Sequence, residues 1–193
     1  MKYKHLLHVP FTGLGLYQGF RGNRFLKNRI QVFKQFVIPS LQAQTDKNFI
    51  LWLAFRYEEK SNRDVIELEK YLKGKGLKFV FTFAGICLYD DKYPDEIAKD
   101  RLLSSIHGSM GELLNVMGEA EIILMTIQPS DDCYRSSFVK EIQLAFRENP
   151  KLQAIGYDRG YICNYKTLEN KEYNPKTNPP FYTIKFSRDI FIE

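Results

Sequence analysis

Hydrophobic positions along this chain alternate between strand-like runs and helix-like spacing. The segments whose pattern predicts a strand are 4–10, 48–55, 77–83, 121–127 and 181–186, and 152–165 predicts a pair of strands. Residues 48–55 form a nearly continuous apolar run, which is typical of a strand buried on both faces of a parallel sheet.

Between these runs, apolar residues recur every three or four positions, which predicts amphipathic helices. The first such face consists of Leu26, Ile30, Phe33, Val37 and Leu41. Pro39 lies within it and should kink or divide the helix, because proline lacks the backbone N–H that helical bonding requires. A second helix follows Asn62, a third begins near residue 95, and a fourth contains Phe138 and Ile142. Gly108 and Gly111 are expected to interrupt the third helix.

The alternation of strands and helices predicts an α/β fold in which a mostly parallel sheet carries helices on both faces. We expect residues 1–193 to form a single three-layer domain, because the chain shows no linker, repeat or low-complexity segment. The composition is that of a globular protein, with 44% hydrophobic and 26% charged residues.

Charge and cysteine content change this picture little. The formal net charge is +5, which favours anionic partners. Because lysine and arginine are spread along the chain, nucleic acid is not expected as a partner, while peripheral contact with a membrane is left open. The three cysteines, Cys87, Cys133 and Cys163, lack the spacing of a zinc site or disulfide framework. No apolar run is long enough to cross a bilayer, and the first residues predict a strand rather than a signal peptide, so a cytoplasmic location is expected.

Two adjacent carboxylates, Asp131 and Asp132, follow the strand predicted at 121–127. Ligands of open parallel sheets bind beyond the carboxyl ends of the strands, and paired carboxylates at such a place can hold a divalent cation. The structural alternative is that Ser130 or Asp131 caps a helix beginning near Tyr134.

Three stretches resemble inverting family-2-type glycosyltransferases, and in particular their bacterial rhamnosyltransferase branch. The segment GSMGELLNVMGEAEIILMTIQPSDD, from Gly108 to Asp132, resembles the part of that family in which a buried strand ends in D-x-D-D. Residues 24–55 share the order of a first helix, PSL-Q-Q-T and a strand with tryptophan, and SDDCYRSSFVKEIQ is similar to the stretch that follows the family's paired aspartates.

This resemblance implies a nucleotide-diphospho-sugar transferase of the type A fold, which would bind a nucleoside-diphosphate sugar with Mg²⁺ or Mn²⁺. Asp132 and Asp131 match the end of the metal-binding motif, with Asp132 as the first metal ligand and Asp131 contacting metal or sugar. The first aspartate of the motif falls on Pro129, which offers no ligand atom.

Further roles follow only from the resemblance. Asp90 and Asp91 could contact the base and Arg101 the diphosphate, although a polar loop and an exposed salt bridge are the respective alternatives. Arg56 occupies the place of an acidic base- or ribose-binding residue. Glu58 or Glu59 could take over that role, and the alternative, which we expect, is a surface position. Asp158 is the candidate for the general base that inverting transfer requires, and the chain ends sooner than the family leads one to expect.

The sequence therefore predicts a metal-dependent glycosyltransferase that acts on a glycan or related acceptor. The alternative is a non-catalytic domain of the same fold that binds a nucleotide or a glycan, and Pro129, Arg56 and the early end of the chain favour it. Tyr157, Tyr161 and Tyr165 are expected to pack across strands rather than to form a sugar platform.

Overall fold

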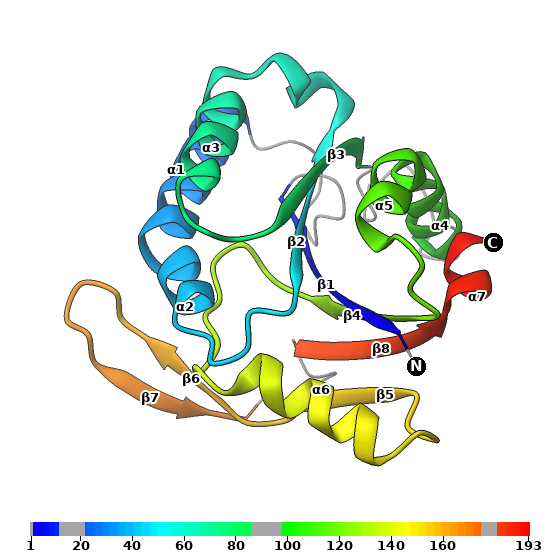
Figure 1. Cartoon of the computed structure of the whole chain (residues 1–193). Helices are drawn as coiled ribbons and strands as arrows, with labels where there is room; N and C mark the ends of the chain where they lie inside the picture. Colours follow the sequence, from blue (N-terminus) through cyan, green and yellow to red (C-terminus); the bar gives the residue numbers. More distant parts are fainter. Residues whose placement is uncertain (1, 12–21, 86–97, 175–180) are drawn as a thin grey trace.

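A six-stranded mixed sheet forms the centre of the computed structural model, which describes residues 2–11, 22–85, 98–174 and 181–193 (Figure 1). Its strand order is β3-β2-β1-β4-β8-β5. The strands are β1 (Tyr3–Pro10), β2 (Ile50–Arg56), β3 (Phe79–Gly85), β4 (Ile122–Ile127), β5 (Ala154–Tyr157) and β8 (Phe181–Ser187).

The first four strands of the chain are parallel, and β8 enters the sheet antiparallel to both β4 and β5. The predicted α/β fold with a mostly parallel sheet is thereby confirmed. Both strands expected within residues 152–165 are present, as β5 and β6 (Gly160–Cys163), but they do not pair with each other, since β5 pairs with β8 and β6 pairs with β7 (Asn170–Tyr173).

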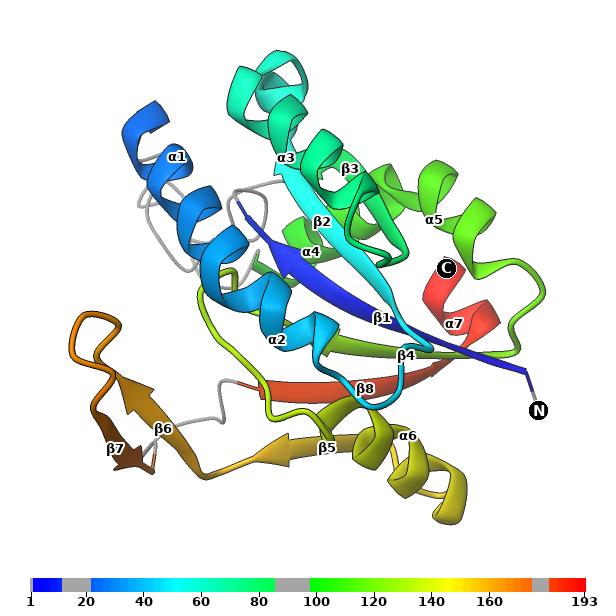
Figure 2. The ribbon, with the colours of Figure 1, turned by 60° about the vertical axis from the view of Figure 1, so that its left-hand side comes forward.

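Helices cover both faces of the sheet (Figures 1 and 2). One layer contains α1 (Gly22–Val32), α2 (Ile38–Gln42), α3 (Arg63–Lys73) and α6 (Phe138–Glu148); the other contains α4 (Ala98–Gly108), α5 (Met110–Met117) and the C-terminal α7 (Arg188–Ile192). Each layer has its own apolar core, since Leu7 and Leu53 face the first while Leu6 and Trp52 face the second. This alternation follows from the two-residue period of a strand.

The first helical stretch is divided near Pro39, as predicted. A π-helical turn, η1 (Phe33–Val37), separates α1 from α2, and the Ile38 N–H donates to the Phe33 carbonyl five residues back. Because Pro39 has no N–H, the ordinary helical ladder cannot continue through it, and the wider turn absorbs the irregularity. All five apolar residues predicted for this face are buried.

The third helical stretch is interrupted at Gly108, as predicted, with α5 starting two residues later, but the interruption expected at Gly111 is wrong, because Gly111 lies within α5. A Cβ atom at Gly108 would lie 2.7 Å from the Cβ of Ala84 on β3. Only glycine therefore allows the end of α4 to lie this close to the sheet.

A buried polar chain joins the sheet to α6. His5 Nε2 lies 2.7 Å from Thr126 Oγ1, which is 2.6 Å from Thr183 Oγ1, and the amide of Gln143 reaches His5 Nδ1 at 3.3 Å. These contacts link β1, β4, β8 and α6, and pairing keeps the buried polar atoms from destabilising the core. Burial lowers the pKa of His5 to about 3, so its imidazole is neutral at physiological pH.

The β6–β7 hairpin projects away from the sheet (Figures 1 and 2). Tyr161 and Tyr165 are 76% and 64% exposed, so their predicted cross-strand packing is wrong. Tyr157 belongs to β5 instead and packs against Phe138, with ring centres 5.4 Å apart. The regular spacing of the three tyrosines was misleading because the chain leaves the sheet after Tyr157.

In the described parts of the chain, no helix has both the length and the apolar character needed to span a bilayer. The structure also describes Cys133 and Cys163 as free thiols.

Candidate functional site

The acidic pair lies where the parallel strands end. Asp131 and Asp132 belong to the segment between β4 and α6, at the carboxyl edge that β1 and β4 share. Asp158 lies at the same edge, because β4 and β5 are both antiparallel to β8 and therefore run in one direction. The topology thus places the three carboxylates that were predicted to serve metal binding and proton transfer at one edge of the sheet, with β8 between the strands that carry them and Asp158 exposed to solvent.

Residues 128–137, between β4 and α6, are called the acidic segment below, and side chains within and next to this segment hold it in a tight turn. The buried amide of Gln128 donates from Nε2 to the carbonyls of Pro129 and Asp132, at 2.7 and 2.8 Å. The Tyr134 hydroxyl donates to the Ile127 carbonyl at 3.1 Å, and its ring stacks on Phe138. The segment is therefore an ordered turn.

The helix-cap alternative for this segment is wrong. Helix α6 begins at Phe138 with Ser137 at its N-cap, so neither Ser130 nor Asp131 caps it. The residues from Asp131 to Ser136 lie outside any helix because Gln128 and Tyr134 hold the backbone in the turn.

Gln44, just beyond α2, fixes the acidic segment from outside. It is 2% exposed, and its Nε2 donates to the carbonyls of Ser40 and Arg135 while its Oε1 accepts from the Val139 N–H. The Thr45 N–H donates to the Ser136 carbonyl at 2.8 Å. One end of the first helical stretch is thus attached by hydrogen bonds to the segment that carries the carboxylates.

Replacing Gln44 by alanine is expected to loosen this attachment. The change leaves the Val139 N–H and two carbonyls without their partner in a buried place, which should lower the free energy of unfolding by about 2 kcal/mol. Urea unfolding followed by circular dichroism measures the change, with Gln153→Ala at an exposed position as control. Equal stability of the two variants would contradict the assigned role of Gln44.

Arg29 of α1 pairs directly with one carboxylate of the site. Its guanidinium forms an ion pair with Asp131, and the two side chains are 15% and 45% exposed. The Arg29 guanidinium also lies 5.3 Å from the centre of the Phe25 ring. The charge of Asp131 is therefore balanced by a largely buried cation, whereas none of the ion pairs between described residues includes Asp132.

Asp132 is partly buried, and burial is the main cause that raises its pKa to about 6. The negative charge of Asp131 raises the pKa further, and the positive charge of Arg29 acts in the opposite direction. A bound cation would stabilise the ionised form of Asp132, because its positive charge offsets both the loss of solvation on burial and the repulsion from Asp131.

The remaining predicted residues are Asp90, Asp91, Arg101 and Arg56. Asp90 and Asp91 lie outside the described residues, and for Arg101 only the backbone, in α4, is described. Arg56 is partly exposed and pairs with Glu58 at 3.4 Å, as expected for a surface position. Among the described residues, no three histidine, cysteine or acidic side chains are arranged to hold a metal ion by themselves.

Sequence analysis did not predict several residues that lie near the site. His8 and Gln128 are buried, and within the described parts of the chain both nitrogens of the His8 ring and the Gln128 Oε1 lack a hydrogen-bond partner. The His8 ring packs edge-on against Trp52 with centres 3.9 Å apart. Arg29 and Gln44 were likewise missed, since periodicity shows which helical positions are buried but not which distant loop they contact.

Comparison with known families identifies one stretch of the chain. Residues 20–59 match the family described as "Putative rhamnosyl transferase". The match covers about a fifth of the chain and confirms the resemblance predicted for residues 24–55. A search of curated proteins found no match.

The matched stretch includes the residues that hold the acidic segment. Arg29, Gln44 and Thr45 all lie within residues 20–59 and contact positions between 131 and 139. The family that residues 20–59 match is described as one of sugar transferases, and this match supports the prediction of a glycosyltransferase.

Proposed function

We propose that this chain is a glycosyltransferase of the type A fold that binds a nucleoside-diphosphate sugar with Mg²⁺ or Mn²⁺ and transfers the sugar to a glycan or related acceptor. The observation that carries the proposal is the partly buried Asp132 beside Asp131 at the carboxyl edge of β4, held there by residues of the rhamnosyl transferase match.

The residues present fit a divalent cation that is shared with its substrate. Asp132 offers one carboxylate in a place that favours a cation, while Asp131 is engaged by Arg29 and Pro129 contributes no ligand. Mg²⁺ keeps several water ligands and commonly binds through one or two carboxylates together with substrate phosphates. Such a site needs no third protein ligand, in line with the residues described here.

The chain's own residues would divide the work at this edge. Asp132 binds and orients the metal-bound diphosphate, and the cation, when bound, offsets the charge that develops on the leaving group. Arg29 keeps Asp131 in place and supplies positive charge close to the diphosphate. Asp158, which follows the end of β5 at the same edge of the sheet, is the side chain we propose to accept the proton of the acceptor hydroxyl.

Thermal-shift binding of UDP, GDP and dTDP sugars, each with and without Mn²⁺, tests the donor site. We expect stabilisation by one nucleotide that depends on Mn²⁺ and is lost in Asp132→Ala, because that variant removes the metal ligand. Asp189→Ala is the matched control, since Asp189 lies in α7 beyond the other edge of the sheet. If the nucleotide still stabilises Asp132→Ala in a metal-dependent way, the site assignment is wrong.

Asp158→Asn separates donor binding from transfer. The variant should keep the donor affinity of the unmodified chain and lose transfer about 100-fold or more, the usual scale of general-base catalysis. Product formation from the donor identified above is the measurement, with Asp189→Asn, an exposed carboxylate in α7 at the opposite edge of the sheet, as control. Unchanged turnover would exclude Asp158 as the base.

A non-catalytic domain of the same fold is the second candidate. Two features favour it, namely Pro129 at the first motif position and the ion pair that engages Asp131. It predicts nucleotide or glycan binding without dependence on Mn²⁺, so the thermal-shift series distinguishes the two candidates directly.

A further inference from the structure

The positive charge of the chain is concentrated in one stretch. Residues 22–75 contain 11 of the 28 lysines and arginines but only 6 of the 23 aspartates and glutamates, so their net charge of +5 equals that of the whole chain. The stretch includes α1, α2 and α3, which lie on one side of the sheet (Figure 2). An anionic partner is therefore attracted to this helical layer.

The outer faces of α1 and α3 carry cations of this layer. Arg24 and Lys27 are exposed on α1, and Lys70 is exposed on α3. Lys34, which is partly exposed, follows Lys27 by about two helical turns and lies on the same side. We call the surface formed by Arg24, Lys27, Lys34, Ile66 and Lys70 the basic surface.

Neighbouring carboxylates do not neutralise the basic surface. The carboxylates of α3 serve other cations, since Arg63 pairs with Glu67 at 2.9 Å and Lys73 pairs with Glu69 at 3.0 Å. Within the described parts of the chain, no ion pair includes the cations of the basic surface, namely Arg24, Lys27, Lys34 and Lys70. Their charges therefore remain available to a partner.

Lys34 connects the two helices into one surface. Its Nζ lies 5.1 Å from the centre of the Tyr71 ring, and the Tyr71 hydroxyl donates to the Lys34 carbonyl at 3.4 Å. The hydrogen bond from Arg63 and the charge of Arg63 lower the pKa of Glu67, and the charges of Lys34 and Lys70 lower it further. Cations from both helices thus act on the same place at the seam between them.

An exposed isoleucine lies among these cations. Ile66 is 39% exposed on α3, with Arg63 three residues before it and Lys70 four residues after it, so the three share one helix face. Such an apolar side chain suits the boundary between lipid head groups and acyl chains, while long basic side chains reach the phosphates. The described aromatic residues of α1 and α3, Phe25 and Tyr71, are partly buried, so this face lacks the exposed rings on which nucleic-acid bases stack.

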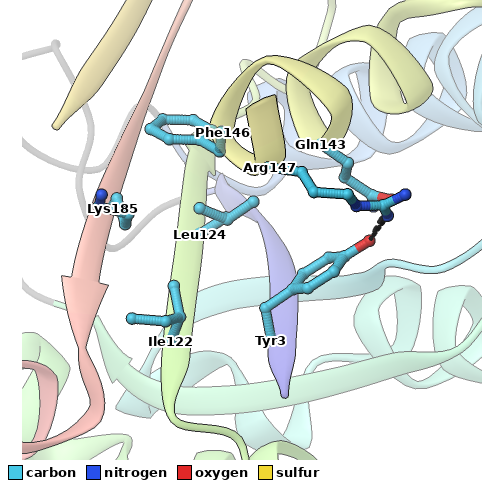
Figure 3. A pocket seen from close by; sticks show the side chains of 7 residues that line it. All are labelled: Tyr3, Ile122, Leu124, Gln143, Phe146, Arg147 and Lys185. Atoms are coloured by element: carbon cyan, nitrogen blue, oxygen red, sulfur yellow. Dashed lines mark hydrogen bonds between the residues drawn. The ribbon is translucent and has the colours of Figure 1, made fainter. Parts of the chain in front are cut away.

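The cations beside the pocket under α6 do not form a comparable surface. Arg147 Nη2 donates to the Tyr3 hydroxyl at 3.0 Å, and Lys185 Nζ donates to the Pro150 carbonyl. Figure 3 shows Arg147 turned toward Tyr3 and Lys185 on the opposite side of the pocket, with apolar side chains between them. These two cations bind groups of the protein itself and are too far apart to act together on one anion.

We propose that the basic surface docks the protein on an anionic lipid bilayer, with its four cations against lipid phosphates and Ile66 at the level of the head groups. The inference does not depend on the proposed transferase activity, because it uses none of the residues of the acidic segment. Arg29, on another side of α1, pairs with Asp131, so the basic surface and the proposed donor site lie on two sides of one helix.

Sedimentation of the full chain with lipid vesicles tests the proposal. The vesicles consist either of phosphatidylcholine alone or of phosphatidylcholine mixed with an equal part of anionic phosphatidylglycerol. We expect binding to the mixed vesicles only, and release by added NaCl because salt screens the charges. Lys27→Gln and Lys70→Gln should each lower the partition coefficient about fivefold, the scale of one lysine at an anionic membrane surface.

Ile66→Asn removes the apolar contact but no charge, and it should lower the partition coefficient about twofold or more. Lys151→Gln is the matched control, since Lys151 is exposed and lies between α6 and β5, at the far end of the sheet from α3, and it should bind as the unmodified chain does. Circular dichroism checks that every variant is folded.

Four results would overturn the proposal. They are absence of binding to the mixed vesicles, equal binding to phosphatidylcholine alone, and an unchanged partition coefficient in the variant that combines Lys27→Gln with Lys70→Gln. The fourth is unchanged binding of Ile66→Asn together with equally tight binding of single-stranded RNA at the same salt concentration, which would show that any polyanion suffices.

Discussion

Asp132→Asn is expected to make the protein more stable at pH 7 and, at the same time, unable to bind a donor through a metal. The carboxyl has a pKa of about 6 in the folded protein against 3.8 ordinarily, so its ionised form is less favourable in the fold than in the unfolded chain. Each pH unit between these values corresponds to about 1.4 kcal/mol, which gives an upper limit of about 3 kcal/mol, reduced by the partial exposure to solvent.

The sign of this effect fixes its dependence on pH. Because the folded pKa is the higher one, the folded protein binds more protons between pH 3.8 and about 6, and Asp132 lowers the free energy of unfolding as pH rises through that window. The neutral asparagine does not titrate. The advantage of Asp132→Asn should therefore be absent below pH 3.8, grow toward pH 6 and remain constant above it.

The quantity to measure is the difference in the free energy of unfolding between Asp132→Asn and the unmodified chain at each pH. Burial lowers the pKa of both His5 and His8 to about 3, so these residues make the fold more stable as pH rises toward their ordinary value, which opposes Asp132. Urea unfolding at pH 4, 5, 6 and 7 gives the difference, with Asp189→Asn as control. A variant less stable than the unmodified chain at pH 7 would show that Asp132 makes a favourable contact as a carboxylate.

Trp52→Ala is expected to have the largest effect on stability. Trp52 is fully buried on β2, its Nε1 donates to Thr82 Oγ1 at 2.8 Å, and the His8 ring packs against it. Truncation opens a large cavity in the core beneath α4 and α5 and leaves the Thr82 hydroxyl without its donor, so a loss of about 3–5 kcal/mol in the free energy of unfolding follows.

A second substitution keeps this prediction testable if Trp52→Ala fails to fold. Trp52→Phe preserves most of the apolar volume and removes the hydrogen bond to Thr82, for an expected loss of about 1–3 kcal/mol. The matched control is Tyr161→Ala, an aromatic truncation at a 76% exposed position, which should change stability by less than about 0.5 kcal/mol. A comparable loss in Tyr161→Ala would mean that the hairpin, rather than the core, limits stability.

The acidic segment shows how the two halves of the site depend on each other. The carboxylates come from residues after β4, but the groups that hold them come from residues some ninety positions earlier, within the stretch that matches the rhamnosyl transferase family. The glutamine and threonine of that stretch, Gln44 and Thr45, are the hydrogen-bond partners of the segment.

The sequence by itself determined the order and type of the main elements. Residues such as 48–55 have no polar side that could face water, and Leu26 to Leu41 repeat at helical spacing, so local hydrophobicity specifies a buried strand and an amphipathic helix. Pro39 also acts locally, through its missing N–H, and that interruption was predictable for this reason. The break at Gly108 was predictable from the weak helix propensity of glycine, but its missing Cβ matters because of Ala84 on β3, which is a tertiary contact.

Only the tertiary structure decided which distant residues meet. Strand β8 follows β7 in the chain but lies between β4 and β5 in the sheet, and this placement brings Asp158 to the edge that holds Asp132. The pairing of Arg29 with Asp131 and the raised pKa of Asp132 arise in the same way. Such contacts depend on side chains far apart in the sequence, and periodicity carries information only about a residue's near neighbours.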